Sequence, residues 1–196
     1  MNNKRKKYNI FEGFRNLFQA FRTTKYLKRA EKNGSLDKPF QERLMLAVTE
    51  VNGCAMCSYA HTKMALEAGL DSESIRELLS GTFDGIPESQ LPAVLFAQHY
   101  AETRGKPTKE TWNQIVKDYS KPTALGILGA IRMIMVGNTY GVPFGSFIHR
   151  FTKDKAKIDE RSNLGYELIM ILTIIPFTII ALILAKLTNL FTSHVM

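Results

Sequence analysis

The sequence predicts an all-α domain that is followed by a single transmembrane helix. Apolar residues recur three and four positions apart along most of the chain, which is the spacing of amphipathic helices. No segment between turn signals alternates apolar and polar residues as a half-buried strand would. Near the C-terminal end, Leu168–Ala185 runs for eighteen residues without a charge, and about 20 predominantly apolar residues are enough to cross a bilayer.

Length and composition fit one domain with extensions. The chain has 196 residues, of which 45% are hydrophobic and 22% are charged, so it can bury a core and is not typical of a disordered protein. Residues 1–38 hold eleven Lys and Arg, among them Lys4, Arg5, Lys6 and Lys7, against three acidic residues. A basic segment indicates an anionic partner, either a nucleic acid or an acidic membrane surface. No nucleic-acid recognition motif accompanies the charge, so we expect no nucleic-acid partner.

Seven helices are predicted before the uncharged run. They cover Ile10–Phe21, Gln41–Val51, Cys54–Ala68, Asp71–Leu79, Leu91–Arg104, Thr108–Tyr119 and Pro122–Val136. Asp37 is a candidate N-cap, Ser72 or Asp71 is the candidate N-cap of the fourth helix, and Gly69 is a candidate C-terminal cap. The helix that starts at residue 122 is expected to end at Gly137-Asn138, because the segment that follows, Tyr140–Phe147, is rich in glycine and proline.

The first helix, Ile10–Phe21, has an apolar stripe interrupted by polar residues, so it lacks the apolar region of a secretory signal peptide. Two interpretations stay open: the helix packs on the domain core, or it lies on a bilayer with its phenylalanines buried and its basic residues near lipid phosphates. The predicted parts of the chain are a basic amphipathic N-terminal arm (1–37), a helical domain (38–151), a charged linker (152–163), a transmembrane helix (164–191) and a tail (192–196).

The uncharged run is predicted to be a membrane span. Leu187, Leu190 and Phe191 extend it past Lys186, whose long side chain can reach the interface. The basic residues before the run are Arg150, Lys153, Lys155, Lys157 and Arg161. Only Lys186 and the weakly basic His194 follow it, so the positive-inside rule predicts one crossing of the cell membrane with the main domain facing the cytoplasm. The alternatives are a buried core helix and a contact between subunits.

The only two cysteines, Cys54 and Cys57, begin a Cys-x-x-Cys-x-x-x-His motif that ends at His61. On a helix with 3.6 residues per turn these three positions share one face. Cys54 follows the Asn52-Gly53 break and starts its helix, where free N–H groups and the helix dipole stabilise a thiolate. The two sulfurs can close a disulfide, and His61 can take or donate a proton. The motif therefore predicts thiol–disulfide chemistry.

Three other interpretations of the motif stay open. Cys54, Cys57 and His61 could be zinc ligands, with His99 or His149 as the fourth. A thioredoxin-type site would need a β-strand before the cysteines, and none is predicted there. Two small buried cysteines and a hydrogen-bonded histidine could also be purely structural.

The stretch Glu42–Gly69 resembles the carboxymuconolactone decarboxylase/alkyl hydroperoxidase D superfamily. Glu42 stands twelve residues before Cys54, and the run Val51-Asn52-Gly53-Cys54 matches the family's usual approach to its cysteines. The resemblance extends, more loosely, over Pro39–Arg150 and implies an all-α AhpD-like domain that assembles into trimers or larger rings. In the hydroperoxidase branch, a glutamate, two cysteines and a histidine form a proton relay, and the cysteines cycle between dithiol and disulfide.

Carried over to this chain, the resemblance implies that Cys54 and Cys57 are the redox pair, that His61 is the base or relay group, and that Glu42 orients it. Glu50 is nearer to the cysteines in sequence, but the family pattern does not need an acid there. The implied substrate is a peroxide or a peroxiredoxin-type protein, and the implied electron donor is a lipoyl-like dithiol. No cofactor and no metal are implied.

The sequence thus predicts a membrane-anchored, homo-oligomeric thiol–disulfide oxidoreductase with peroxidase or disulfide reductase activity in antioxidant defence. The cysteine pair argues against lactone decarboxylation, because the decarboxylase branch generally lacks it. The alternative function is a non-enzymatic, membrane-bound helical oligomer whose cysteines are structural or bind a metal.

Overall fold

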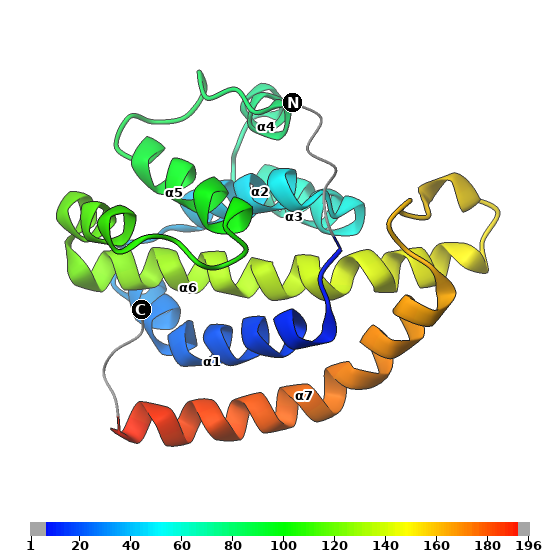
Figure 1. Cartoon of the computed structure of the whole chain (residues 1–196). Helices are drawn as coiled ribbons and strands as arrows, with labels where there is room; N and C mark the ends of the chain where they lie inside the picture. Colours follow the sequence, from blue (N-terminus) through cyan, green and yellow to red (C-terminus); the bar gives the residue numbers. More distant parts are fainter. Residues whose placement is uncertain (1–6, 192–196) are drawn as a thin grey trace.

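A computed structural model describes residues 7–191 of the chain, and it contains helices and no strand over that range (Figure 1). The helices are α1 (Ile10–Lys32), α2 (Lys38–Asn52), α3 (Ala55–Glu67), α4 (Ser72–Ser80), α5 (Leu91–Glu102), α6 (Lys109–Arg150) and α7 (Leu164–Phe191), with a short 3-10 helix, η1, at Lys155–Lys157. The all-α prediction is confirmed. The basic residues Lys4, Arg5 and Lys6, His194 and the predicted tail 192–196 lie outside the described residues.

The long helix α6 runs through the middle of the molecule (Figure 1). Helices α2, α3, α4 and α5 lie on one side of it, and α1 and α7 lie on the other. Helix α1 contacts both α6 and α7, and α2 contacts α3, α4, α5 and α6. Helix α3 also touches α6 directly, so the predicted redox motif lies beside the central helix.

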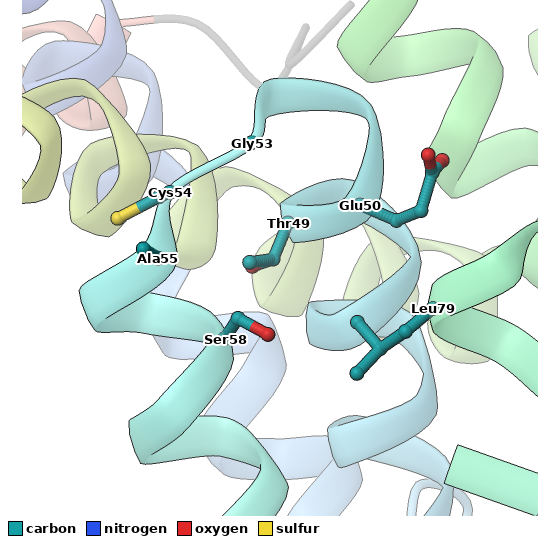
Figure 2. A pocket seen from close by; sticks show the side chains of 7 residues that line it. All are labelled: Thr49, Glu50, Gly53, Cys54, Ala55, Ser58 and Leu79. Atoms are coloured by element: carbon teal, nitrogen blue, oxygen red, sulfur yellow. The ribbon is translucent and has the colours of Figure 1, made fainter. Parts of the chain in front are cut away.

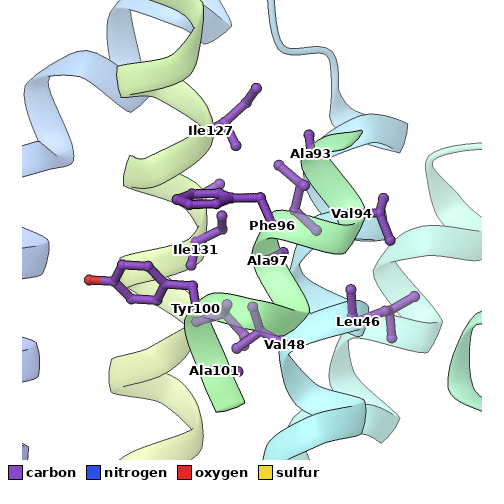
Figure 3. Close-up of a cluster of buried hydrophobic side chains, with 14 of the residues drawn as sticks. Leu46, Val48, Ala93, Val94, Phe96, Ala97, Tyr100, Ala101, Ile127 and Ile131 are labelled. Carbon is purple, nitrogen blue, oxygen red and sulfur yellow. The ribbon is translucent and has the colours of Figure 1, made fainter. Parts of the chain in front are cut away.

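The main core lies between α2, α5 and α6 (Figure 3). The side chains that fill it are apolar and buried. They include Leu46 and Val48 of α2, Val94, Phe96 and Tyr100 of α5, and Ile127 and Ile131 of α6. Burying one large apolar side chain stabilises a fold by about 1.5–3 kcal/mol, so this cluster fixes α2 against the rest of the bundle.

Helices α2 and α4 begin at residues that the sequence identifies. Asp37 and Asp71 each accept a backbone hydrogen bond at the start of α2 and α4, as predicted, and a cap of this kind contributes about 1 kcal/mol. Helix α3 begins at Ala55, one residue later than predicted, with Cys54 as its N-cap.

Helix α6 matches the prediction in its first half and departs from it in the second. The predicted boundary between two helices near residue 120 is confirmed, because Ser120 has φ 64° and kinks the helix. The predicted end at Gly137-Asn138 is wrong, since the helix continues to Arg150. Tertiary packing overrides the low helix propensity of this segment, because Gly141 and Gly145 lie against the start of α3.

Helix α1 packs closely against α6 through small residues. A side chain added at Gly126 would collide with Cβ of Ala30, and one added at Gly129 would lie 2.9 Å from Cβ of Leu27. Of the two interpretations of the first helix, the structure supports packing on the core. The boundary proposed at residue 37 stays a prediction.

Helix α7 lies below α1 in Figure 1 and runs along the length of the bundle. The ring of Phe177 packs edge-on against Phe14 at 5.4 Å, and Met170, Ala181 and Ala185 are buried. Only 17% of its most apolar window is buried in the bundle, compared with 78% for the apolar window of α6. By length and composition α7 is a candidate membrane span.

Candidate active site

The turn between α2 and α3 carries the first cysteine. Gly53 adopts φ 64° and ψ 47°, a left-handed conformation that glycine reaches without a steric penalty. This turn places Cys54 at the N-cap of α3, where its sulfur accepts a 3.3 Å hydrogen bond from the N–H of Cys57. Because a helix N-terminus stabilises negative charge, this position favours a Cys54 thiolate in the reduced protein.

Cys54 and Cys57 form a disulfide, with their Cα atoms 5.3 Å apart. The pairing that the one-turn spacing allows is therefore present. Cys54 is 1% exposed and Cys57 is 6% exposed. A peroxide or an incoming thiolate would need a local opening of the structure to reach either sulfur.

The disulfide packs against Gly141 of α6. A Cβ atom at this position would lie 2.7 Å from Sγ of Cys57 and 2.8 Å from Sγ of Cys54, which is far closer than carbon and sulfur can approach. Glycine therefore leaves the space that both sulfur atoms occupy. From the sequence, Gly141 is only one member of the Gly- and Pro-rich segment 140–147.

The second half of the site joins α2 to α3. Oε2 of Glu42 lies 2.7 Å from Nδ1 of His61, and Oε1 of Glu42 lies 2.6 Å from Nζ of Lys38. The Glu42 side chain is fully buried, and that of His61 is 15% exposed. Burial alone would raise the pKa of Glu42, but the hydrogen bonds from His61 and Lys38, together with their charges, outweigh burial and lower this pKa. Glu42 is therefore an anion at neutral pH, and it fixes the orientation of the imidazole.

Helix α3 connects the two halves. His61 follows Cys57 by one turn of α3, so the imidazole and the disulfide lie on the same face of the helix. The structure thus brings Cys54 to Cys57 and Glu42 to His61. The arrangement offers two sulfurs that can exchange electrons, a helix N-terminus that favours a thiolate, and a carboxylate-backed imidazole that can move a proton.

A cavity of about 250 Å³ lies beside the Cys54 turn (Figure 2). Its lining includes Glu50, Ser58 and Leu79. In Figure 2 the sulfur of Cys54 points away from these side chains, in agreement with its contact to Gly141 of α6. Glu50 lines this cavity, whereas Glu42 contacts His61, so the geometry favours Glu42 as the carboxylate of the site.

The predicted linker 152–163 folds back onto the same turn. The guanidinium group of Arg161 donates hydrogen bonds of 3.0 Å to the carbonyl oxygens of Asn52 and Gly53. The carboxylate of Asp159 pairs with this guanidinium group, and the backbone N–H of Asp159 donates to the hydroxyl of Ser146 on α6. The segment before α7 therefore holds the residues that immediately precede Cys54.

A second cavity of about 250 Å³ lies between α3, α6 and this segment. Its lining includes Met56, Gly141, His149 and Ile158. Gly141 borders both this cavity and the disulfide, so it is the residue that separates the cavity from the sulfur atoms. The Met56 side chain, which is 39% exposed, covers the same face.

The two histidines considered as further zinc ligands lie on different elements. His149 borders the second cavity at the end of α6, and His99 lies on α5. Within residues 7–191, no three His, Cys, Asp or Glu side chains are grouped so that they could hold a metal ion.

Residues 16–84 match the model of the Carboxymuconolactone decarboxylase family. Over this segment the chain is similar to the carboxymuconolactone decarboxylase family. The matched segment contains Glu42, Cys54, Cys57 and His61, and it confirms the resemblance found in the sequence. No curated protein and no solved structure matches the chain.

The matched segment starts inside α1 and ends after α4. It overlaps the stretch Pro39–Arg150, over which the sequence suggested a resemblance, but it starts earlier in the chain and also ends earlier. Two contributors to the site, Gly141 and Arg161, lie beyond the segment. Neither residue could be predicted as part of the site from the sequence. A Gly-rich segment or a charged linker does not indicate which of its residues will contact the turn that carries Cys54.

Proposed function

We propose that the protein is a thiol–disulfide oxidoreductase with peroxidase or disulfide reductase activity in antioxidant defence. Cys54 and Cys57 are the redox pair, His61 transfers protons, and Glu42 positions His61. One observation carries this proposal: a buried disulfide at the N-terminus of α3 shares that helix with an imidazole that is hydrogen-bonded to a buried carboxylate.

In the peroxidase reaction, one cysteine thiolate attacks the O–O bond of a hydroperoxide. The bond breaks, the alcohol leaves, and the cysteine becomes a sulfenic acid. The second thiol attacks the sulfenic sulfur, closes the disulfide and releases water, so that two electrons have passed from the cysteines to the peroxide. His61 accepts the proton of the attacking thiol and delivers a proton to the leaving oxygen.

An external dithiol completes the cycle. A lipoyl-like dithiol reduces the Cys54–Cys57 disulfide through a mixed disulfide and is itself oxidised. In the disulfide reductase reaction, the reduced pair instead passes its two electrons to a disulfide of a peroxiredoxin-type protein. Both reactions start from the same reduced pair of sulfurs.

We further propose that the protein works as a homo-oligomer at the cytoplasmic face of the cell membrane. The uncharged run of α7 supports membrane attachment, and the excess of basic residues between α6 and α7 supports the cytoplasmic side, where anionic lipids favour positive charge.

The test is a count of free thiols in the reduced full-length protein, before and after one equivalent of alkyl hydroperoxide. We expect the loss of two thiols and the loss of two hydrogens from the intact mass. Cys54→Ser and Cys57→Ser should each prevent disulfide formation and turnover with a dithiol donor. Thiols that stay reduced, or bound zinc at one equivalent, would favour the alternative of a non-enzymatic membrane-bound oligomer with structural or metal-binding cysteines.

A further inference from the structure

Helix α7 has two faces of different character. Glu167, Met170, Ala181 and Ala185 are buried against the bundle. Between and around them, the large hydrophobic residues that the helix exposes over residues 164–189 are all aliphatic. Those exposed by 40% or more include Leu168, Ile169, Leu172, Ile175, Ile179, Ile180, Ile183, Leu184 and Leu187. One face of α7 therefore packs against the bundle, and the other face is apolar and exposed.

The buried face of α7 packs along the length of α1. An added Cβ at Gly13 of α1 would lie 3.4 Å from Cε of Met170. One residue further along α1, the ring of Phe14 meets Phe177, which is close to the centre of the uncharged run. Buried Glu167 is anchored at the start of α7 by Arg150 of α6, at 2.5 Å.

Charged groups lie along α1, which runs in the same direction as α7 (Figure 1). The pair of Glu12 and Arg104 lies near Tyr166, at the start of α7. Further along α1, the guanidinium group of Arg22 lies over the ring of Phe18, 5.8 Å from its centroid, and this ring belongs to the apolar cluster that α1 shares with the middle of α7. If α7 crossed a bilayer while packed on α1, the charge of Arg22 would be carried to the depth of the acyl chains, where charged side chains are strongly disfavoured.

We infer that α7 lies in the plane of the membrane surface, with its Leu/Ile face in the lipid and the bundle above it, and does not cross the bilayer. In this arrangement the charged groups of α1 stay in water while the exposed aliphatic face is buried. Helices that lie in the interface in this way bury one apolar face about 5–10 Å into the lipid. The inference rests on the membrane attachment proposed above and is independent of the redox chemistry.

The composition of the exposed face favours lipid over a second copy of the chain. Protein interfaces are enriched in aromatic residues, Met and Arg, and the large hydrophobic side chains exposed by 40% or more in the uncharged run are leucine and isoleucine. Lys186 stands exposed at the end of the run, where it can meet the phosphate groups of an anionic bilayer.

The experiment measures on which side of a vesicle the two ends of α7 lie. The full chain carries one protease-cleavable tag after Met196 and a second in the loop 82–86, and it is synthesised without cells in the presence of phosphatidylcholine/phosphatidylglycerol vesicles. We expect the protein to float with the vesicles and external protease to remove both tags or neither. Floating protein with one tag cut and the other protected until detergent is added would overturn the inference, because α7 would then cross the bilayer.

Matched variants test the lipid-facing side chains. Leu172→Glu with Ile175→Glu should reduce the vesicle-bound fraction at least tenfold, while the far-UV circular dichroism spectrum stays unchanged. Leu95→Glu, a change at an exposed leucine on α5, should leave vesicle binding unchanged. Wild-type protein that does not float, but dissociates into monomers in the Leu172/Ile175 variant, would also overturn the inference, since the face would then be a contact between copies. The thiol count of the proposed redox reaction is unaffected by either result.

Discussion

The carboxylate of Glu42 and the imidazole of His61 form a 2.7 Å contact between two helices, although nineteen positions separate them in the chain. Helix α2 supplies the carboxylate from within the core, and α3 supplies the imidazole on the face that bears the cysteines. Because Glu42 is fully buried and ionised, His61 is held by a group that cannot easily move away. Such a partner fixes the tautomer and orientation of a histidine that transfers protons.

Glu42→Gln should slow turnover while leaving the disulfide able to form. The amide keeps a hydrogen-bonding oxygen but loses the negative charge that holds the imidazole of His61 in place. We expect a decrease of about 10–100-fold in the rate of peroxide reduction, as is common when a partner of a functional histidine is removed. Glu50→Gln, at the cavity on the other side of the turn, is the matched control. An equal loss of rate in both variants would argue against a specific role of Glu42.

The same carboxylate should make stability depend on pH. The pKa of Glu42 is lower in the folded protein than its ordinary value of 4.5, so ionised Glu42 stabilises the fold. This contribution is fully present above about pH 4.5 and is lost as the pH falls through the lower pKa of the folded state. The difference in unfolding free energy between wild type and Glu42→Gln should therefore be largest near neutral pH and shrink below pH about 4.5. Urea unfolding at several pH values measures it, and a constant difference would contradict the prediction.

Gly141→Ala should disturb the disulfide directly. The new methyl group would overlap both sulfur atoms, and overpacking of this kind costs about 1–3 kcal/mol. Gly145→Ala is the same change one turn later, where the nearest atom, Cβ of Met56, would be 3.5 Å away. There the better helix propensity of alanine should stabilise the protein by up to about 1 kcal/mol. Urea unfolding of the oxidised proteins compares the two, and equal effects would show that the sulfur contact is unimportant.

Arg161→Ala should make the reduced cysteines less reactive. Without the two hydrogen bonds to Asn52 and Gly53, the turn before Cys54 is less fixed and a nearby positive charge is lost, so the thiolate is less favoured. We expect alkylation at neutral pH to slow by about 3–10-fold, with partial recovery in Arg161→Lys. Arg150→Ala breaks the ion pair with Glu167 at the start of α7 and leaves the hydrogen bonds of Arg161 to the turn in place. If it slowed alkylation equally, a general loosening of the segment would be the better explanation.

Gly126→Ala should weaken the attachment of α1 to α6. The added methyl group meets Cβ of Ala30, and we expect a loss of about 1–3 kcal/mol. Gly137→Ala places its methyl group 3.3 Å from the end of the flexible Ile134 side chain, which can shift. It should be close to neutral in thermal unfolding, and a neutral Gly126→Ala would mean that α1 is not packed closely on α6.

Local signals explain why much of the fold could be predicted from the sequence. The caps at Asp37 and Asp71 and the break near residue 120 act on neighbouring backbone, so short segments reveal them. The end of α6 could not be found this way. Gly141 and Gly145 favour a break when considered alone, and they are helical because α3 packs against them.

The residues of the candidate site also fall into two groups, those that local spacing predicts and those that it does not. Cys54, Cys57 and His61 are neighbours on one helix, so their spacing predicts that they lie together. The choice of Glu42 over Glu50 came from the resemblance to a family, and the structure supplies the contact that supports it. Arg161 could not be predicted, because its contact with Gly53 spans 108 positions and depends on how the segment before α7 folds back.

Arg161 also limits how the protein can be shortened. A version of the chain without the apolar helix α7 is most simply made by cutting soon after α6. Such a cut would take away the side chain that holds the Asn52-Gly53 peptide carbonyls, together with the wall that η1 and its neighbours add to the second cavity. A fragment that keeps residues up to 163 retains both, so enzymology on trimmed protein should start from that length.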